Sequence, residues 1–228
     1  MSLYTNTSDV ASELGGVTID NSSTPSATVV LSWIADASKE IEELTGRVWA
    51  STTVSSASGY EYHDYDGSGR VRFKNVPVIS VQGVEYEENG VGSATSSWVA
   101  LTEGRTFSQH YIVYKDEGLV VFHSNTDGYL PTKGQQNVRI TYTYGYIVTP
   151  RHIKRLCTLM VAKRYISTVA HKTASSEGGS VSVGSISVSD PNNYVDNHLS
   201  GINKELEMLL REVATRFKTR IYDITEYD

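Results

Sequence analysis

The stretch from Asn137 to Cys157, NVRITYTYGYIVTPRHIKRLC, places a β-strand directly before a helix with one proline between them. In its first half, apolar and aromatic residues alternate with Arg139 and two threonines, which is the period-two pattern of a half-buried strand. After Pro150 the apolar residues recur at spacings of three and four among basic residues. This predicts a helix that begins near the proline and reaches about His171. The chain must therefore join a β unit to a helical unit.

Three further segments have helical periodicity. A short helix is predicted from Ser8 to Leu14, where Ser8 or Thr7 can cap the start and two glycines follow the end. The strongest pattern runs from Ala27 to Trp49, and a last helix is predicted from about Asn197 to Lys218. Both of these longer helices have an apolar stripe that needs a partner surface. The stripe of the helix from Ala27 consists of Val30, Trp33, Ile34, Ala37, Ile41, Leu44 and Val48. The stripe of the last helix consists of Ile202, Leu206, Leu209, Leu210, Val213 and Phe217.

Between these helices, from about Thr52 to Val148, the sequence changes to short alternating runs separated by DGSG, ENG, DEG and NTDG. Clusters of Asp, Asn and Gly form tight turns, so a compact antiparallel β unit of about six or seven strands is predicted. The predicted fold class is α+β, a small bundle of about four helices with a long antiparallel β-rich insertion between the second and third helices. The corresponding domains are 1–50 with 149–228 for the helical core and its C-terminal tail, and 51–148 for the insertion.

Composition excludes several classes of protein. The net charge of -6 opposes tight binding of nucleic acid, which needs massed Lys and Arg. The N-terminus does not have the pattern of a signal peptide, and no apolar run approaches the roughly 20 residues that cross a bilayer. We therefore expect a soluble protein, made in a cytoplasm, without a membrane partner. The single cysteine, Cys157, excludes an internal disulfide, and its place in an apolar stripe favours a buried small residue over a nucleophile.

The sequence lacks the motifs that usually carry catalysis or cofactor binding. The histidines are scattered without an HExxH pair, and neither a phosphate-binding glycine loop nor a GxSxG turn is found. We expect no enzymatic activity, no cofactor and no metal. The weak metal candidates are Asp64, Asp66 and Ser68, which match the first half of a calcium loop. Asn75 stands where that loop needs a bidentate glutamate, so a β-hairpin turn is favoured.

Several phrases occur in a particular order along the chain. They are a helix ending in LTGRVW, the insertion phrase VPVISVQGVEY, the stretch VRITYTYGYIVTPRHIKRLC, and SVGSISVSD before the last helix. In this order and spacing the chain resembles the head-tail adaptor (connector) proteins of tailed phages and related archaeal viruses, from about Thr7 to Phe217. Two departures are an insertion longer than that of small members and a segment after Phe217 without a matching motif.

The resemblance implies a function without catalysis. Adaptors of this family form a ring, usually a dodecamer, beneath the portal in the virion neck. They extend the DNA channel, offer a docking surface to the stopper or tail, and let DNA pass in packaging and ejection without sequence-specific binding. We expect assembly in the host cytoplasm, and a modestly acidic channel would let DNA slide. The alternatives are another neck or tail subunit, such as a stopper or tail terminator, and a carbohydrate-binding or hydrolytic β module suggested by the many tyrosines and Trp98.

Two regions are predicted to bind partners. The Ser- and Gly-rich segment SVSVGSISVSD contains an alternating hairpin that would pair with a neighbouring subunit on assembly, with a simple surface hairpin as the alternative. The C-terminal end would place a helix and an aromatic tail in a groove of the portal. The residues chosen are Val181, Val183, Ile186, Val188, Phe217, Ile221, Tyr222, Ile224 and Tyr227.

Overall fold

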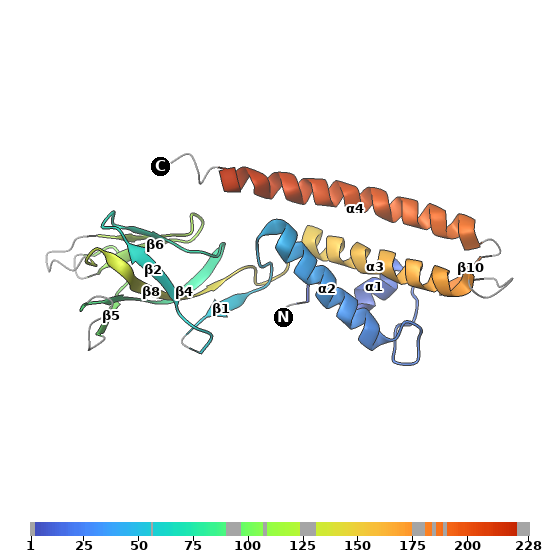
Figure 1. The fold of residues 1–228 in the computed structure, drawn as a ribbon, viewed down its shortest axis with the longest axis horizontal. Helices are drawn as coiled ribbons and strands as arrows, with labels where there is room; N and C mark the ends of the chain where they lie inside the picture. Colours follow the sequence, from blue (N-terminus) through green and yellow to red (C-terminus); the bar gives the residue numbers. More distant parts are fainter. Residues whose placement is uncertain are drawn as a thin grey trace. The chain divides into compact units, whose positions relative to one another are not determined.

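The chain divides into two compact units, one formed by residues 1–49 with 149–228 and the other by residues 50–148. The computed structural model describes residues 3–55, 57–89, 97–106, 109–123, 131–174, 181–183, 186–188 and 191–222; at 170–174, 181–183, 186–188, 191–198, 214 and 216–222 it describes the backbone alone. The first unit is helical and the second is β-rich (Figure 1). This confirms the predicted α+β class with a β-rich insertion between the second and third helices.

The helical unit is organised around its third helix. It contains α1 (Thr7–Glu13), α2 (Ala27–Thr45), α3 (Arg151–Ala174) and α4 (Pro191–Tyr222), with the short strands β9 (Val181–Val183) and β10 (Ile186–Val188) between α3 and α4. α1, α2 and α4 all contact α3. Consistent with this central place, α3 is buried on several sides, at Ile153, Leu156, Cys157, Leu159, Val161 and Ala162.

Pro150 lies immediately before α3, as the strand-to-helix stretch predicts. Its carbonyl accepts hydrogen bonds from the backbone N–H groups of Ile153 and Lys154, both at 3.0 Å. Proline suits this place because the first positions of a helix do not need a backbone N–H donor. The helix continues to Ala174, slightly beyond the predicted end at His171.

The apolar stripe of α2 is buried at Val30, Trp33, Ile34, Ala37 and Ile41, as predicted. Leu44 was assigned to the same stripe, but its side chain is 61% exposed. α2 runs antiparallel to α3, because Ser38 Oγ lies 3.6 Å from Cys157 Sγ while Asp36 pairs with Arg164 farther along α3. Leu44 is therefore level with the start of α3, where the covering surface ends. α2 itself stops at Gly46, which has φ +61°.

The N-terminal segment is fastened to α2 and α3 by buried polar contacts. Tyr4 is 2% exposed, its hydroxyl donates to Glu42 Oε1 at 2.5 Å, and it accepts from the backbone N–H of Trp49 at 2.9 Å. Burial raises the pKa of Tyr4, and the hydrogen bond to Glu42 adds to this. The Thr5 and Thr158 hydroxyls lie 2.7 Å apart. These contacts place α1 beside α3.

α4 begins at Pro191, ahead of the predicted start at Asn197. The segment PNNYVDN is poor in strong helix formers and has no apolar repeat, so its pattern did not reveal a helix. Proline at the first position is a favourable helix start. None of the described helices is both long and apolar enough to cross a lipid bilayer.

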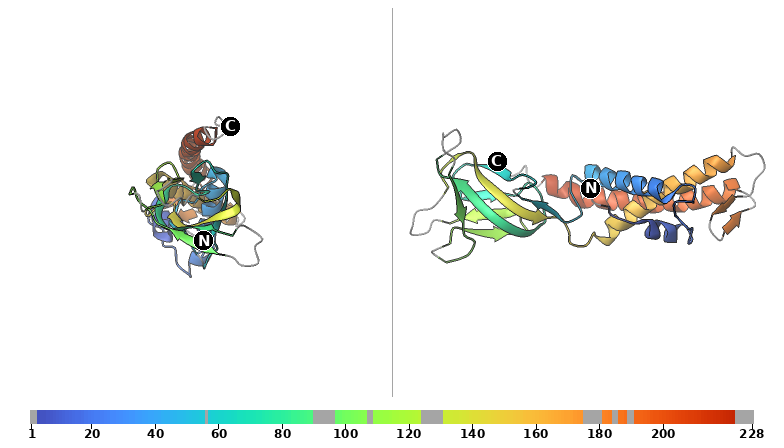
Figure 2. Two further views of the ribbon diagram at one scale, coloured as in Figure 1. Left: turned by 90° about the vertical axis from the view of Figure 1, so that its left-hand side faces the viewer. Right: turned by 90° about the horizontal axis from the view of Figure 1, so that it is seen from below.

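The β unit consists of two antiparallel sheets. Its described strands are β1 (Thr52–Val54), β2 (Glu61–Tyr65), β3 (Arg70–Arg72), β4 (Val78–Glu87), β5 (Trp98–Leu101), β6 (Tyr111–Tyr114), β7 (Leu119–Phe122) and β8 (Gly134–Tyr144). One sheet has the order β1-β8-β4-β5 with β2 also paired to β8, and the other has the order β3-β7-β6. The long strands β4 and β8 lie side by side in Figure 2. Strands β1 and β3 have three residues each, too short for a clear alternating pattern, so the sequence indicated fewer strands.

The core of the β unit lies between the two sheets. Along β8, Val138, Ile140 and Tyr142 have no exposed surface, whereas Arg139, Thr141 and Thr143 are half-buried on the other face, which confirms the predicted alternation. The second sheet contributes buried residues to the same cluster, including Val71, Val120 and Phe122.

The DYDGSG turn is not a hairpin, and that prediction was wrong. β2 pairs with β8, whereas β3 pairs with β7, so the turn carries the chain from one sheet to the other. Its local chemistry is still that of a turn, because Asp66 Oδ1 accepts from the Ser68 backbone N–H at 2.8 Å and Gly67 and Gly69 have positive φ angles. The Asp and Gly residues correctly predict a turn at this place. They do not predict which strands β2 and β3 pair with.

Candidate functional site

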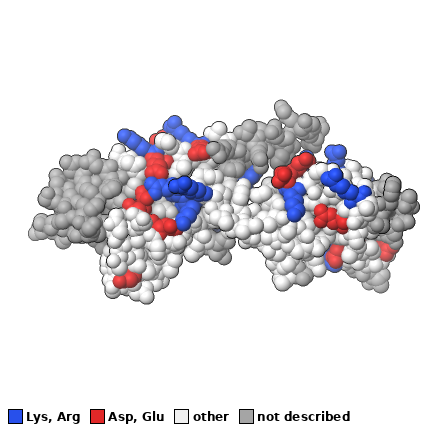
Figure 3. Space-filling view, turned by 180° about the vertical axis from the view of Figure 1, so that it is seen from behind, with Lys and Arg blue, Asp and Glu red and all other residues white. Residues whose placement is uncertain are grey.

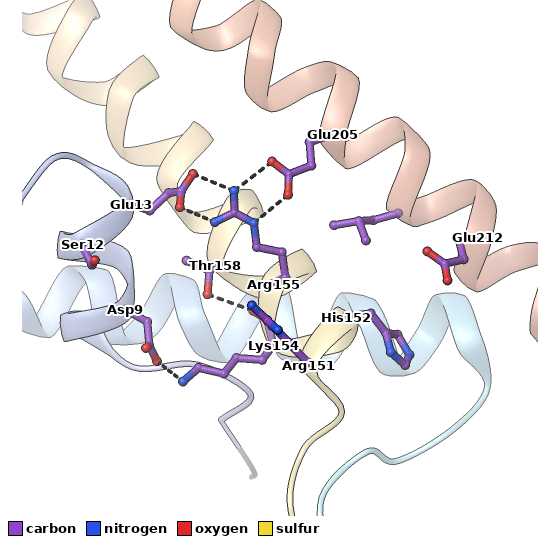
Figure 4. Close-up of a pocket in the computed structure, with 11 residues that line it drawn as sticks. Asp9, Ser12, Glu13, Arg151, His152, Lys154, Arg155, Thr158, Glu205 and Glu212 are labelled. Atoms are coloured by element: carbon purple, nitrogen blue, oxygen red, sulfur yellow. Dashed lines mark hydrogen bonds and ion pairs between the residues drawn. The ribbon is translucent and has the colours of Figure 1, made fainter.

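A cleft of about 830 Å³ opens between α1, α3 and α4 in the helical unit (Figure 4). Charged side chains dominate its walls. The lining residues are Asp9, Ser12, Glu13, Arg151, His152, Lys154, Arg155, Thr158, Glu205, Leu209 and Glu212. The basic residues all come from α3, and the acidic residues come from α1 and α4.

Arg155 lies at the centre of this cleft and joins three helices. Its Nε and Nη2 donate to the two carboxylate oxygens of Glu205 in α4, at 2.7 and 2.8 Å. Nη2 and Nη1 also donate to Glu13 in α1, the former at 3.0 Å. The hydrogen bonds that Arg155 donates, chiefly to Glu205 and then to Glu13, raise the pKa of Arg155, and the hydrogen bond to Glu205 also lowers the pKa of Glu205. One guanidinium group thus holds two carboxylates in paired geometry.

A second ion pair lies beside Arg155. Lys154 Nζ is 2.8 Å from Asp9 Oδ2, and Asn6 caps α1 by accepting from the Asp9 backbone N–H at 2.8 Å. Five of the charged groups in the cleft are therefore paired across helices. The arrangement is suited to holding α1 and α4 against α3, because each ion pair joins a side chain of α3 to one of another helix.

Sequence reasoning missed this cluster because it treated the basic residues of α3 only as the surroundings of an apolar stripe. Arg151, Lys154 and Arg155 follow the i, i+3, i+4 spacing of one helix face, and Asp9 and Glu13 follow i, i+4 in α1. Two helices with charge faces of opposite sign are the signal that the sequence contains. It does not say which helices meet, so the pairing with Glu205 could not be inferred.

α4 extends beyond the level at which α3 begins. Arg155 meets Glu205, and the chain reverses direction between α3 and α4, so residue 209 is level with the first residue of α3. Beyond this point α4 continues for roughly 20 Å at 1.5 Å per residue (Figure 1 and Figure 2). Val213 is the last buried side chain described in α4. In the sequence, Phe217 and Ile221 follow it at a spacing of four, which continues the apolar repeat of Ile202, Leu206 and Val213.

The predicted partner-binding residues fall in two places. Val181, Val183, Ile186 and Val188 form the antiparallel hairpin β9–β10, in which Ile186 pairs with Val183 and Val188 with Val181. Phe217, Ile221 and Tyr222 lie in the last turns of α4, where the structure describes the backbone alone. Ile224 and Tyr227 lie outside the described residues. The hairpin precedes the first residue of α4, whereas Phe217, Ile221 and Tyr222 lie near its last residue, so the two groups are at opposite ends of α4.

Both carboxylates among the weak metal candidates accept hydrogen bonds from the backbone. Asp64 Oδ1 accepts from the Gln136 backbone N–H at 2.7 Å, and Asp66 accepts from Ser68. The hydrogen bonds from Ser68 lower the pKa of Asp66. Within the described part of the chain, no three His, Cys, Asp or Glu side chains lie close enough together to hold a metal ion.

Cys157 is fully buried, which confirms the prediction of a small core residue. Burial raises the pKa of its thiol to about 11, against a weaker opposite effect of the hydrogen bond with Ser38. A thiol with this pKa stays protonated near neutral pH and is a poor nucleophile.

The aromatic residues near Trp98 pack on an arginine. The guanidinium carbon of Arg139 lies 4.1 Å from the ring centroid of Tyr60 and 4.2 Å from that of Trp98, and Arg139 also pairs with Glu85. Tyr62 meets both rings edge-on. This cluster links β2, β8, β4 and β5 across one face of the sheet. The aromatic rings of the cluster thus pack within the sheet, which is an alternative to a role in binding sugars.

Charges of both signs are interspersed on the surface. Figure 3 shows Lys and Arg side chains next to Asp and Glu on both units, without a broad face of one sign. A protein that holds nucleic acid through phosphates presents a continuous basic surface. The face shown offers none.

Comparison with known proteins gives distant likenesses among solved structures. No family model and no curated protein matches the chain. Among solved structures, it is similar to a chain of a structure described as the neck of an empty GTA particle computed with C6 symmetry, with 16% identity, a TM-score of 0.47, and coverage of 69% of this chain and 75% of that chain. A likeness this distant does not identify a family, so the function has to be argued from the residues of this chain.

Proposed function

We propose that this chain is a structural protein of a virion neck, a head-tail adaptor that forms a ring of twelve copies under the portal. The ring extends the DNA channel for packaging and ejection and gives the stopper or tail its docking surface. The chain carries out no catalysis and needs no cofactor in this role. The resemblance in the order of its sequence phrases supports this proposal, together with an architecture in which a β unit is inserted between two pairs of helices.

The observation that carries the proposal is the continuation of the α4 backbone to Tyr222, well past the level at which α3 begins. The apolar repeat of α4 continues in the sequence beyond the level of the first residue of α3, and such a repeat needs a surface to cover it. Phe217, Ile221 and Tyr222, followed by Ile224 and Tyr227, give the end of the chain large apolar groups of the kind that fill grooves. We assign the portal as the partner of this segment.

Ring formation needs two different surfaces on each copy that fit each other. Head-to-tail contacts of this kind close into a ring when the rotation between copies permits. The hairpin β9–β10 supplies one such surface, because its outer strand edges carry backbone groups that can pair with a neighbouring copy. DNA would pass the ring without sequence-specific contacts, since charges of both signs are mixed along the chain and the net charge is -6.

Cryo-electron microscopy of the particle neck tests the proposal. A ring of this chain between portal and tail, with the end of α4 on the portal, is the expected result. Absence of the chain from the neck would refute the function. A ring whose α4 ends point away from the portal would refute only the assignment of that partner, and a strongly basic channel wall would refute the sliding role of its charge.

Deletion of Ile221 to Asp228 tests the contact separately. The shortened protein should keep the far-ultraviolet circular dichroism of the full chain but no longer join particles that contain a portal. Met208→Gln is the matched control, because Met208 is 70% exposed on the docked part of α4 and should be dispensable. Equal incorporation of the deletion and the control would contradict docking by this segment.

A further inference from the structure

Hydrogen bonds between Thr102 and His110 join the end of β5 to the start of β6. The His110 backbone N–H donates to the Thr102 carbonyl at 2.8 Å, and the Thr102 backbone N–H donates to His110 Nδ1 at 3.1 Å. The Thr102 hydroxyl also lies 2.8 Å from Nδ1. Because β5 belongs to the five-stranded sheet and β6 to the three-stranded sheet, this Thr102–His110 junction connects the two sheets.

The Thr102 backbone N–H sets the protonation state of the His110 ring. A backbone N–H can only donate, so Nδ1 is the unprotonated nitrogen that accepts, and the neutral ring carries its proton on Nε2. A charged ring has N–H groups at both nitrogens. Its Nδ1 can then donate to the Thr102 hydroxyl, but the Thr102 backbone N–H faces a proton and loses its acceptor. The complete junction therefore requires a neutral histidine.

Charged and titratable groups around His110 come from three elements. His123, directly after β7, is the cross-strand neighbour, because its backbone N–H donates to the His110 carbonyl at 3.1 Å. Glu103 and Arg105 follow β5, and Arg70 lies in β3, the strand on the other side of β7. Glu103 favours a charged ring at His110, whereas the two arginines and a charged His123 oppose one. These charges are mixed, so the response of the junction to pH depends on the hydrogen bond to Nδ1.

We propose that the Thr102–His110 junction is a pH-sensitive connection between the two sheets of the β unit. Histidine changes its charge between about pH 5 and pH 8. The neutral ring completes the junction at the upper end of this range, and the hydrogen bond to Nδ1 is lost as the pH falls and the ring gains a proton. The bond from the His110 backbone N–H does not involve the ring, so acid loosens the junction without unfolding either sheet. This property belongs to the chain itself and does not depend on the proposed function.

Amide hydrogen exchange of the full-length chain, resolved to single residues by fragmentation in the mass spectrometer, tests the proposal. Exchange is compared at about pH 7.5 and about pH 5.5 after correction for the intrinsic effect of pH, a range over which carboxylates stay ionised. Protection of the Thr102 amide should fall at least about fivefold at the lower pH, because this amide loses its acceptor. Protection of Val120, in the central strand of the three-stranded sheet, should stay the same.

His110→Asn removes the titration but keeps an acceptor, since the amide oxygen of asparagine can take the place of Nδ1. Thr102 protection in this variant should be equal at the two pH values. The same change at the cross-strand neighbour, His123→Asn, is the matched control and should keep the pH response.

Three results would overturn the proposal. The first is Thr102 protection that does not change with pH in the natural protein. The second is a pH response that persists in His110→Asn or disappears in His123→Asn, because either outcome assigns the response to another group. The third is failure of His110→Asn to fold, because a retained acceptor predicts an intact junction.

Discussion

At the scale of single residues, Glu61 is the clearest case of a buried charge with a structural task. It is 7% exposed in β2, and its carboxylate accepts from the Tyr142 hydroxyl at 2.5 Å, the Lys74 backbone N–H at 2.9 Å and His63 Nε2 at 2.7 Å. Burial by itself raises the pKa of Glu61. The hydrogen bonds from His63, Tyr142 and Lys74 outweigh burial, so the pKa lies below its ordinary value of 4.5.

This lowered pKa predicts an acid-sensitive β unit. A group whose pKa is lower in the folded state stabilises that state fully above the ordinary value of 4.5, and loses the contribution as pH falls through the folded value. Urea unfolding between pH 3 and pH 7 should show a fall in the unfolding free energy of the β unit below about pH 4.5. Glu61→Gln should flatten this fall and cost about 1 to 3 kcal/mol at pH 7. Glu88→Gln, at an exposed position, is the control, and a slope in Glu61→Gln equal to that of the control would contradict the assignment.

At the scale of helices and strands, periodicity predicted which face is buried but not where the covering surface ends. Val138, Ile140 and Tyr142 alternate in sequence and are buried as a row, because a strand has only two faces. Leu44 fits the stripe of α2 equally well, yet it is exposed because α3 has not begun at that level. The start of α4 and the sheet change after Asp66 were missed for the same reason, since both depend on contacts with distant parts of the chain.

The docking of α4 should depend on Arg155. Removing its guanidinium in Arg155→Met leaves Glu13 and Glu205 without their shared donor, so the helical unit should lose about 1 to 2 kcal/mol of unfolding free energy. Arg211→Met is the control, because Arg211 pairs with Glu207 on the same exposed helix face and should cost under about 0.5 kcal/mol. Urea unfolding followed by far-ultraviolet circular dichroism measures both. Equal losses in the two variants would show that Arg155 does not fasten α4.

At the scale of the whole molecule, the insertion has the features of an autonomous domain. The buried cluster between its sheets draws only on residues from Val54 to Tyr144. Thr52 in β1 pairs with Tyr144 in β8, so the chain enters and leaves the unit on neighbouring strands, roughly 5 Å apart. Removing the insertion therefore leaves two ends that a short linker can join. The sequence indicated this division because its pattern changes from period 3.6 to period two near residue 50 and back after residue 148.

A fragment of residues 50–148 should accordingly fold by itself. Its core and both sheets are complete, so it should unfold cooperatively in urea and keep the acid sensitivity that Glu61 confers. A fragment of residues 50–136 is the matched control, because it lacks Val138, Ile140 and Tyr142, which have no exposed surface in the core. The control should remain unfolded. Gradual unfolding of the longer fragment, or loss of its acid transition, would mean that the β unit needs the helical unit to complete its core.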